Sequence, residues 1–210
     1  SDIQGNLRDF ARIEEIFASL HAETGDAYLL FLGDLIHGMI HYTADTWPEW
    51  AGPYFPDEST RVVDGLLDLQ IRFPNRVFSL LGNHEHAHIG GVILDAEVAH
   101  FEAAAGDHLA MYEDTFRQFP VAATTECGLL FMHGSPYVEG NFTFDDIADL
   151  EYDGYSSLSI LEMLDVEPLG RMLWARSSPE ENAARLLNSL LPTDTGAGEV
   201  VSGRSEEHTS

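Results

Sequence analysis

The chain has 210 residues, 44% of them hydrophobic, which is enough to bury the core of one domain. Its 10 basic residues, all of them arginine, stand against 36 acidic residues, so the formal net charge is −26. We interpret this acidity as a solvated surface that repels nucleic acid and anionic membranes, and we expect neither as a partner. Cys127 is the only cysteine, which excludes a disulfide framework and a zinc site made of cysteines. No apolar stretch approaches the roughly 18 residues of a membrane-spanning helix, and a cytoplasmic location is our expectation.

Hydrophobic spacing predicts strands that alternate with helices along the chain. Apolar residues recur every three or four positions from Leu7 to Leu20, the pattern of an amphipathic helix, and Asn6 can cap its start. The continuous apolar run 27–32 is typical of a buried parallel strand. The elements expected after it are a loop over 39–57, a helix over 59–71 capped by Ser59, a strand ending at Leu81, helices over 92–105 and 109–119, an antiparallel hairpin over 121–133, a loop over 137–155, helices over 156–164 and 179–191, and a strand over 199–203. This order indicates an α/β fold with antiparallel additions.

Polar side chains follow the ends of these strands, usually next to a glycine. If residues 2–6 are counted as the turn after a strand that would precede Ser1, the strand ends supply Asp2, Gln4, Asp34, Asn83, His84 and His133. Sheets of the α/β class bind their ligands at the carboxyl ends of the strands. Carboxylates, amide oxygens and imidazoles together suit manganese, iron or zinc better than calcium. The strand ends therefore predict a metal site.

Four blocks in this order resemble those of the calcineurin-like metallophosphoesterases. They are residues 2–6 (Asp-Ile-Gln-Gly-Asn), 33–34 (Gly-Asp), 82–85 (Gly-Asn-His-Glu) and 132–134 (Met-His-Gly). Residues 173–176 (Leu-Trp-Ala-Arg) resemble a segment of the bacterial phosphoprotein-phosphatase type, the branch that holds serine/threonine phosphatases. The resemblance implies a four-layer sandwich of mixed sheets flanked by helices, with one domain over 1–203. We expect this domain to be truncated at both ends and residues 204–210 to be a non-native tail.

The resemblance also implies a role for each matching residue. Asp34 would bridge two divalent metal ions, with manganese, iron or zinc as the candidates. Asp2 and Gln4 would bind the first ion, and Asn83 and His133 the second. A hydroxide between the ions would attack the phosphorus of a phosphomonoester, which we expect to be a phosphoserine or phosphothreonine of a protein or else a small phosphoester. His84 would protonate the leaving oxygen, and Arg176 is the candidate for a phosphate contact.

Three departures from the family pattern leave alternatives open. Gln4 stands where the family usually has a histidine, and a glutamine at this place also occurs in some symmetrical diadenosine tetraphosphatase relatives. Residues 35–38 are one residue shorter than the corresponding loop and lack its Asp-Arg pair, so His37, when protonated, is expected to replace part of the missing charge. Arg204 follows Gly203 where a last metal-binding histidine is expected. The alternatives are a nucleotide hydrolase of the diadenosine tetraphosphatase kind and a degenerate phosphatase fold that binds without hydrolysis. His86 and His88 are expected to be surface or loop residues.

Overall fold

The computed structural model describes residues 2–191 and 198–203 of the chain, which contain two small β-sheets. The first sheet is a parallel pair in which Leu30 lies opposite Phe78, and the second is mixed, with β4 between an antiparallel and a parallel neighbour. The strands are β1 (Leu29–Phe31), β2 (Val77–Ser79), β3 (Ala122–Thr124), β4 (Leu129–Met132) and β5 (Glu199–Ser202). The predicted hairpin over 121–133 is confirmed, and so is the last strand, which pairs in parallel with β4.

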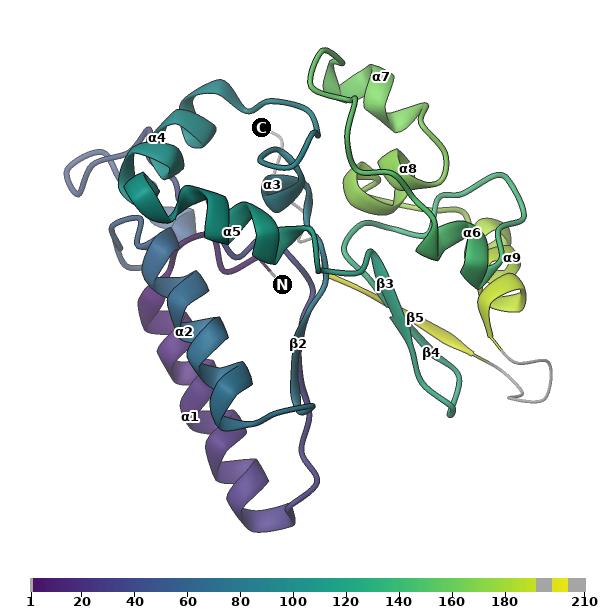
Figure 1. Cartoon of the computed structure of the whole chain (residues 1–210), viewed down its shortest axis with the longest axis horizontal. Helices are drawn as coiled ribbons and strands as arrows, with labels where there is room; N and C mark the ends of the chain where they lie inside the picture. The colour runs from purple at the N-terminus through teal and green to yellow at the C-terminus, as the bar shows by residue number, and fades with distance from the viewer. Residues whose placement is uncertain (1, 192–197, 204–210) are drawn as a thin grey trace.

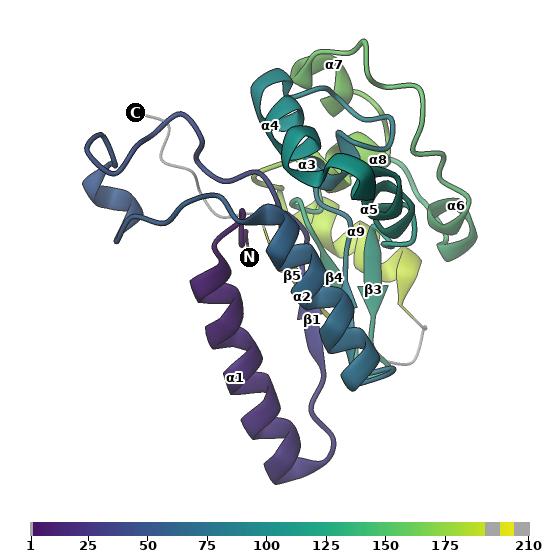
Figure 2. The same cartoon turned by 60° about the vertical axis from the view of Figure 1, so that its left-hand side comes forward.

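Helices cover both sheets (Figures 1 and 2). The α-helices are α1 (Leu7–Thr24), α2 (Ser59–Arg72), α3 (Asn83–His86), α4 (Asp95–Ala105), α5 (Leu109–Phe116), α6 (Phe144–Ala148), α7 (Ile160–Leu164), α8 (Leu169–Trp174) and α9 (Glu180–Leu190), with short 3₁₀ turns at Glu49–Ala51 and Gly106–His108. α1 and α2 lie side by side and α2 contacts β2, whereas α9 contacts β5. Two sheets flanked by helices confirm the predicted α/β class.

The helix pair α1–α2 packs tightly against the first sheet. Asn6 caps α1 as predicted, because its side-chain oxygen accepts a hydrogen bond from the Asp9 N–H at 3.2 Å. Phe10 of α1 stacks on Phe31 of β1 with the ring centroids 5.5 Å apart. A side chain at Gly65 in α2 would come within 2.6 Å of the Phe10 ring, so this glycine is what allows the two helices to approach.

Several predicted boundaries were wrong. The strands are shorter than their apolar runs, and Ser59 is the first residue of α2 rather than its cap, which is Glu58. The stretches 137–155 and 164–179 contain the short helices α6 and α8, which the sequence did not predict, and the helix expected over 156–164 begins only at Ile160. The predicted non-native tail, 204–210, lies outside the described residues.

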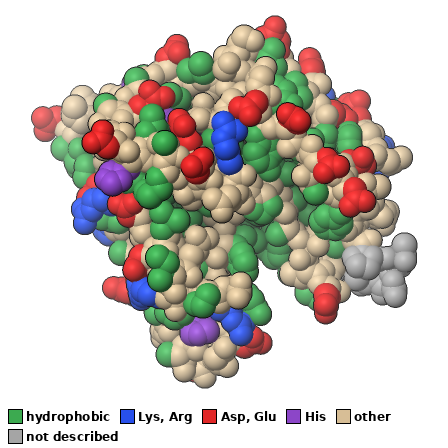
Figure 3. Space-filling model, viewed as in Figure 1, with side chains coloured by type: hydrophobic (Ala, Val, Ile, Leu, Met, Phe, Trp, Pro, Cys, Tyr) green, Lys and Arg blue, Asp and Glu red, His purple; other side chains and the backbone are tan. Residues whose placement is uncertain are grey.

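The acidic side chains spread over the visible face and do not gather in one patch (Figure 3), as expected for a solvated surface. No helix among the described residues is both long and apolar enough to cross a membrane. An apolar cavity of about 950 Å³ lies between the two sheets, lined by residues such as Tyr28, Phe78 and Phe131. None of the predicted site residues lines it, so the chemistry has to be sought at the strand ends.

Candidate metal centre

Backbone hydrogen bonds join the first sequence block to the loop that follows β1. The Ile3 and Gln4 N–H groups both donate to the Asp34 carbonyl, at 2.8 and 2.9 Å, and the Gly5 N–H donates to the Leu35 carbonyl at 2.8 Å. Gln4 and Asp34 both have left-handed backbones, with φ of 44° and 53°. Such conformations are uncommon outside glycine and concentrate at functional sites. The bonds bring Asp2 next to Asp34, as the resemblance implied.

Two glycines allow the second and third blocks to touch. A side chain on Gly33 would come within 2.6 Å of the Gly82 backbone and 3.0 Å of the His133 ring. One on Gly82 would come within 2.3 Å of the Asp34 backbone nitrogen and of its carboxylate. The glycine before each polar residue therefore provides the room in which the metal-site side chains converge.

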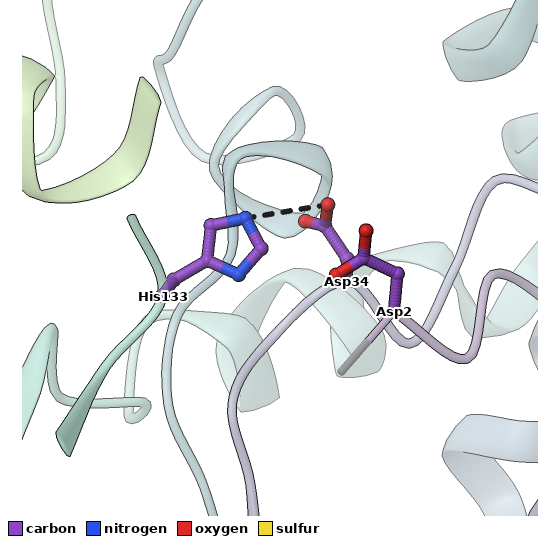
Figure 4. Close-up of side chains that lie close together, drawn as sticks. All are labelled: Asp2, Asp34 and His133. Atoms are coloured by element: carbon purple, nitrogen blue, oxygen red, sulfur yellow. Dashed lines mark ion pairs between the residues drawn. The ribbon is translucent and has the colours of Figure 1, made fainter. Parts of the chain in front are cut away.

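Asp2, Asp34 and His133 form a compact cluster (Figure 4). Each offers one ligand atom, and these atoms lie within 4.8 Å of one another. The dashed line of Figure 4 joins His133 Nε2 to Asp34 Oδ2 at 3.3 Å, and Asn83 Oδ1 lies 3.0 Å from the same nitrogen. Asp34, Asn83 and His133 are buried, with 3%, 1% and 0% of their surface exposed. Four of the five predicted metal ligands are thus brought together.

The orientation of His133 fits a cluster that holds a proton or a metal ion between its acceptor atoms. Its Nδ1 lies 2.7 Å from the Leu32 carbonyl, which can only accept, so Nδ1 carries a proton. In the neutral ring Nε2 then presents a lone pair to the Asp34 carboxylate and the Asn83 oxygen, which would repel it. A proton or a metal ion has to lie among these atoms, and metal-binding histidines are commonly fixed in this way through their second nitrogen. The residues present therefore fit a divalent metal ion.

The charges of the cluster depend on one another. Burial raises the pKa of the Asp34 carboxyl, but the neighbouring imidazoles of His133 and His84 outweigh it and hold that pKa well below its usual range. Burial lowers the pKa of His133, but the Asp34 carboxylate outweighs it and raises the pKa above its usual value. Asp34 is therefore ionised at neutral pH, which its predicted role as a metal-bridging ligand requires.

Glu85 holds the backbone of the two loops that carry Asp34 and Asn83. Burial and the nearby Asp34 charge raise its pKa. Its carboxylate accepts hydrogen bonds from the backbone N–H groups of Asp34 at 2.9 Å, Leu35 at 2.7 Å and Gly82 at 3.0 Å. Both carboxylate oxygens are used in these bonds, which join the loop after β1 to the loop after β2. Glu85 therefore stabilises the loops that carry the cluster and is not one of its ligands.

His84 lies beside the cluster on α3. Its backbone N–H donates to Asp34 Oδ1 at 3.1 Å, and its ring Nε2 is 3.7 Å from Asp34 Oδ2. The side chain is 18% exposed, so the ring borders both the cluster and solvent. This position suits a group that transfers a proton to a substrate held at the cluster.

The structure does not assign a role to the two remaining predicted residues, Gln4 and Arg176. The backbone of Gln4 is joined to Asp34, but its role as a ligand stays a prediction. Arg176 is exposed just after α8 and lines a cavity of about 350 Å³ together with Tyr137 and Arg171. The Ala175 carbonyl accepts from the Ser135 N–H at 2.7 Å, which ties this segment to the loop that follows His133. The predicted phosphate contact of Arg176 also stays a prediction.

The predictions for His37 and His86 were wrong, and the prediction for His88 was wrong in part. His86 is a buried residue of α3, and His88 is also buried, although it lies in the turn after α3 and is a loop residue as expected. His37 does not replace a positive charge, because burial and the neighbouring His84 and His88 lower its pKa to about 2 and keep it neutral. Its Nδ1 lies 2.9 Å from His84 Nδ1, a contact that the sequence reasoning missed. The spacing of His84 and His88 could have indicated that these two rings lie close together. Residues four apart share one face if residues 83–88 are interpreted as a helical turn and not as an alternating strand.

The comparisons with known proteins concern the fold and the family of the chain. Among solved structures, the chain is similar to a protein serine/threonine phosphatase from Saccharomyces cerevisiae that is described as similar to human phosphatase PP5. The TM-score is 0.56 and the identity 19%, over 90% of this chain and 56% of that one, so the likeness shows the fold and the chain spans about half the length of that protein. A model of the calcineurin-like phosphoesterases matches residues 1–192. The family resemblance is thereby confirmed, and the chain belongs to the calcineurin-like phosphoesterase family.

Proposed function

We propose that the protein is a metal-dependent phosphoesterase that hydrolyses phosphomonoesters, with phosphoserine and phosphothreonine of proteins as its substrates. The observation that carries this proposal is the cluster of Asp2, Asp34 and His133, in which Asp34 and His133 are buried and Asp2 is half-buried, with the ring of His84 beside it. Carboxylates and an imidazole held at strand ends are the donor set that manganese, iron or zinc takes in proteins.

Each residue has a separate proposed role in metal binding, proton transfer or phosphate binding. Asp34 would lie between two metal ions, with Asp2 and Gln4 on the first and Asn83 and His133 on the second. When bound, the ions supply a water of lowered pKa and positive charge for the phosphoryl oxygens. His84 gives a proton from Nε2 to the leaving oxygen, so that the alcohol departs neutral. Arg176, which lines a cavity together with Arg171 and Tyr137, would bind two phosphate oxygens.

The surface charge favours a small phosphorylated group over a long polyphosphate. The chain carries 36 acidic and 10 basic residues, and an extended polyanion would be repelled wherever it left the metal cluster. A single phosphoryl group needs positive charge only at the metal cluster, where it would bind. A peptide phosphoserine therefore fits better than diadenosine tetraphosphate. A cytoplasmic location and the bacterial phosphoprotein-phosphatase type belong to the same proposal.

The test compares three substrates at equal concentration with manganese present: p-nitrophenyl phosphate, a phosphoserine peptide and diadenosine tetraphosphate. We expect turnover of the first two and little of the third. Asp34→Asn should lower kcat by roughly a hundredfold or more, because an uncharged amide cannot bridge two metal ions. Asp26→Asn is the matched control, since Asp26 is exposed and pairs only with Arg76 among the contacts described, at 2.7 Å.

The metal content per chain, measured on the purified protein, shows whether a chain without activity holds its metal ions. Only inactivity of a metal-loaded chain counts against the proposal. A chain that holds two metal ions and hydrolyses none of the three substrates would overturn the proposal and favour a fold that binds phosphate without cleaving it. Faster hydrolysis of diadenosine tetraphosphate than of the phosphopeptide would overturn the substrate class alone.

A further inference from the structure

Three histidine rings lie in a row behind the metal cluster. His84 Nδ1 is 2.9 Å from His37 Nδ1, and His37 Nε2 is 2.8 Å from His88 Nε2. The rings of neighbouring members meet edge to face, with centroids 5.0 Å apart in both pairs. His84 is the member next to Asp34, and His88 is the opposite end of the row. The row connects the predicted general acid to the interior of the protein.

The order of protons in this row follows from hydrogen-bond chemistry. When His84 is doubly protonated, as a general acid must be, its Nδ1 carries a proton and can only donate. His37 Nδ1 then has to accept, so the His37 proton sits on Nε2 and is donated to His88 Nε2. A neutral ring can accept on one side and donate on the other, and burial keeps His37 neutral by lowering its pKa to about 2.

We infer that His37 is the positioning residue of the general acid: it accepts the Nδ1–H of His84 and thereby aims Nε2 of His84 at the leaving group. This inference rests on the proposed function. A fixed acceptor behind a catalytic histidine sets both the ring orientation and the nitrogen that exchanges protons, as the aspartate does in a Ser-His-Asp triad. Here a neutral imidazole takes that place, in a loop that has no carboxylate to offer between Leu35 and Gly38.

The surroundings hold His37 in this position. Its φ of 66° is left-handed, and its backbone N–H donates to Ser59 Oγ at 2.9 Å. Ser59 Oγ is in turn hydrogen-bonded to the Asp57 carboxylate. On the other side the Phe101 ring packs against both His37 and His88, with centroids 6.1 and 4.8 Å away. A strained backbone that is held by several independent contacts indicates a position that the fold preserves.

The opposite proton order is the competing possibility. His88 Nδ1 is buried and has no hydrogen-bond partner among the described residues. If that nitrogen carried no proton, His88 Nε2 would donate to His37, and His37 would donate to His84 Nδ1. The neutral His84 ring would then be protonated on Nε2 only. The two orders place the proton of neutral His84 on different nitrogens and can be separated by measurement.

The first test is nitrogen-15 NMR of the histidine rings in the full chain, with His84 assigned by the loss of its signals in His84→Gln. We expect the neutral His84 ring to carry its proton on Nδ1 in the wild type. His37→Asn should keep this tautomer, because the amide oxygen can accept in place of Nδ1 and asparagine tolerates a left-handed backbone. His37→Phe should shift it to Nε2. Protonation on Nε2 in the wild type would overturn the inference, and this readout does not require any activity.

The second test uses leaving groups that differ in their need for a proton. Phenolate leaves poorly without protonation, whereas p-nitrophenolate leaves readily. His37→Phe should therefore lower kcat on phenyl phosphate by about a hundredfold, within the range of general acid catalysis, and change kcat on p-nitrophenyl phosphate by less than about threefold. His37→Asn should restore most of the loss.

The ratio of the two kcat values is independent of how much of a variant is folded, so partial unfolding of His37→Phe does not mimic the effect. His41→Phe is the control, because His41 is exposed and its ring contacts Glu97 at 3.1 Å. Equal losses on both substrates would overturn the inference. A wild type that cleaves neither substrate would overturn the proposed function, and the tautomer measurement would still decide the role of His37.

Discussion

Glu85 holds the backbone of Asp34 across a separation of 51 residues: its Oε2 accepts the Asp34 N–H at 2.9 Å. The same carboxylate accepts the N–H groups of Leu35 and Gly82, at 2.7 and 3.0 Å. A buried charge that is satisfied by several backbone donors is far more costly to alter than a surface one. The shape of the metal cluster therefore depends on a residue that does not bind the metal.

Replacing Glu85 by glutamine should weaken both the fold and the metal site. The amide has one acceptor oxygen, and its NH₂ group would face a backbone N–H that it cannot satisfy. We expect the free energy of unfolding to fall by about 2–4 kcal/mol. Manganese affinity should fall by roughly 10–100-fold, as for other groups that orient metal ligands. Urea denaturation and titration calorimetry measure the two effects.

The matched control for this change is Glu102→Gln, at an exposed position of α4. It removes the same charge from the same protein but no buried hydrogen bond, and it should alter neither quantity measurably. Equal effects of the two substitutions would show that net charge, and not the contacts of Glu85, governs the site.

Gln4→His should tighten metal binding. The Gln4 N–H already donates to the Asp34 carbonyl at 2.9 Å, so the side chain begins from a backbone that is tied to the cluster. An imidazole is a stronger donor than an amide oxygen to zinc or iron. We expect an affinity gain on the order of tenfold, or about 1.4 kcal/mol, measured by competition with a chelator.

Gln118→His adds an imidazole at an exposed position after α5 and serves as the control. The prediction fails if Gln4→His binds zinc no more tightly than this control, and Gln4 would then not be a ligand position.

The strand ends of the metal cluster could be predicted from the sequence because their signal is local. An apolar run followed by glycine and a polar residue defines where a strand stops, and parallel strands stop at one edge of a sheet. Asp34, Asn83 and His133 were located in this way, and the structure places them together. Asp2 was counted among the same strand-end residues, and the structure places it in the same cluster.

The histidine row could not be predicted, because burial depends on tertiary packing. His86 and His88 are polar residues without a motif, and their chemistry alone favours the surface. They are buried because α3 directs His86 towards the Tyr152 carbonyl and the turn after α3 directs His88 towards the Phe101 ring. The helices α6 and α8 were missed for a related reason: at five and six residues they are too short for a hydrophobic period to show.

Buried His86 should make the protein sensitive to acid. Burial lowers its pKa to about 4, although the Tyr152 carbonyl and the Asp153 carboxylate oppose the shift. The unfolded chain has a histidine pKa near 6.5. Between pH 6.5 and pH 4 this histidine is therefore protonated in the unfolded chain but neutral in the folded chain. The stability that neutral His86 contributes is therefore present above pH 6.5 and lost progressively as the pH falls towards 4.

His86→Gln should reduce this sensitivity while keeping the contact of the side chain. Neutral His86 donates through Nε2 to the Tyr152 carbonyl, 2.9 Å away, and the glutamine amide can donate to the same oxygen without titrating. Between pH 7 and pH 5 the wild type should lose about 2 kcal/mol more of its unfolding free energy than the variant does. Urea denaturation at several pH values measures the difference, with the exposed His108→Gln expected to follow the wild-type curve. If the pH dependence of His86→Gln coincides with that of the wild type, the acid sensitivity of the fold originates in other groups.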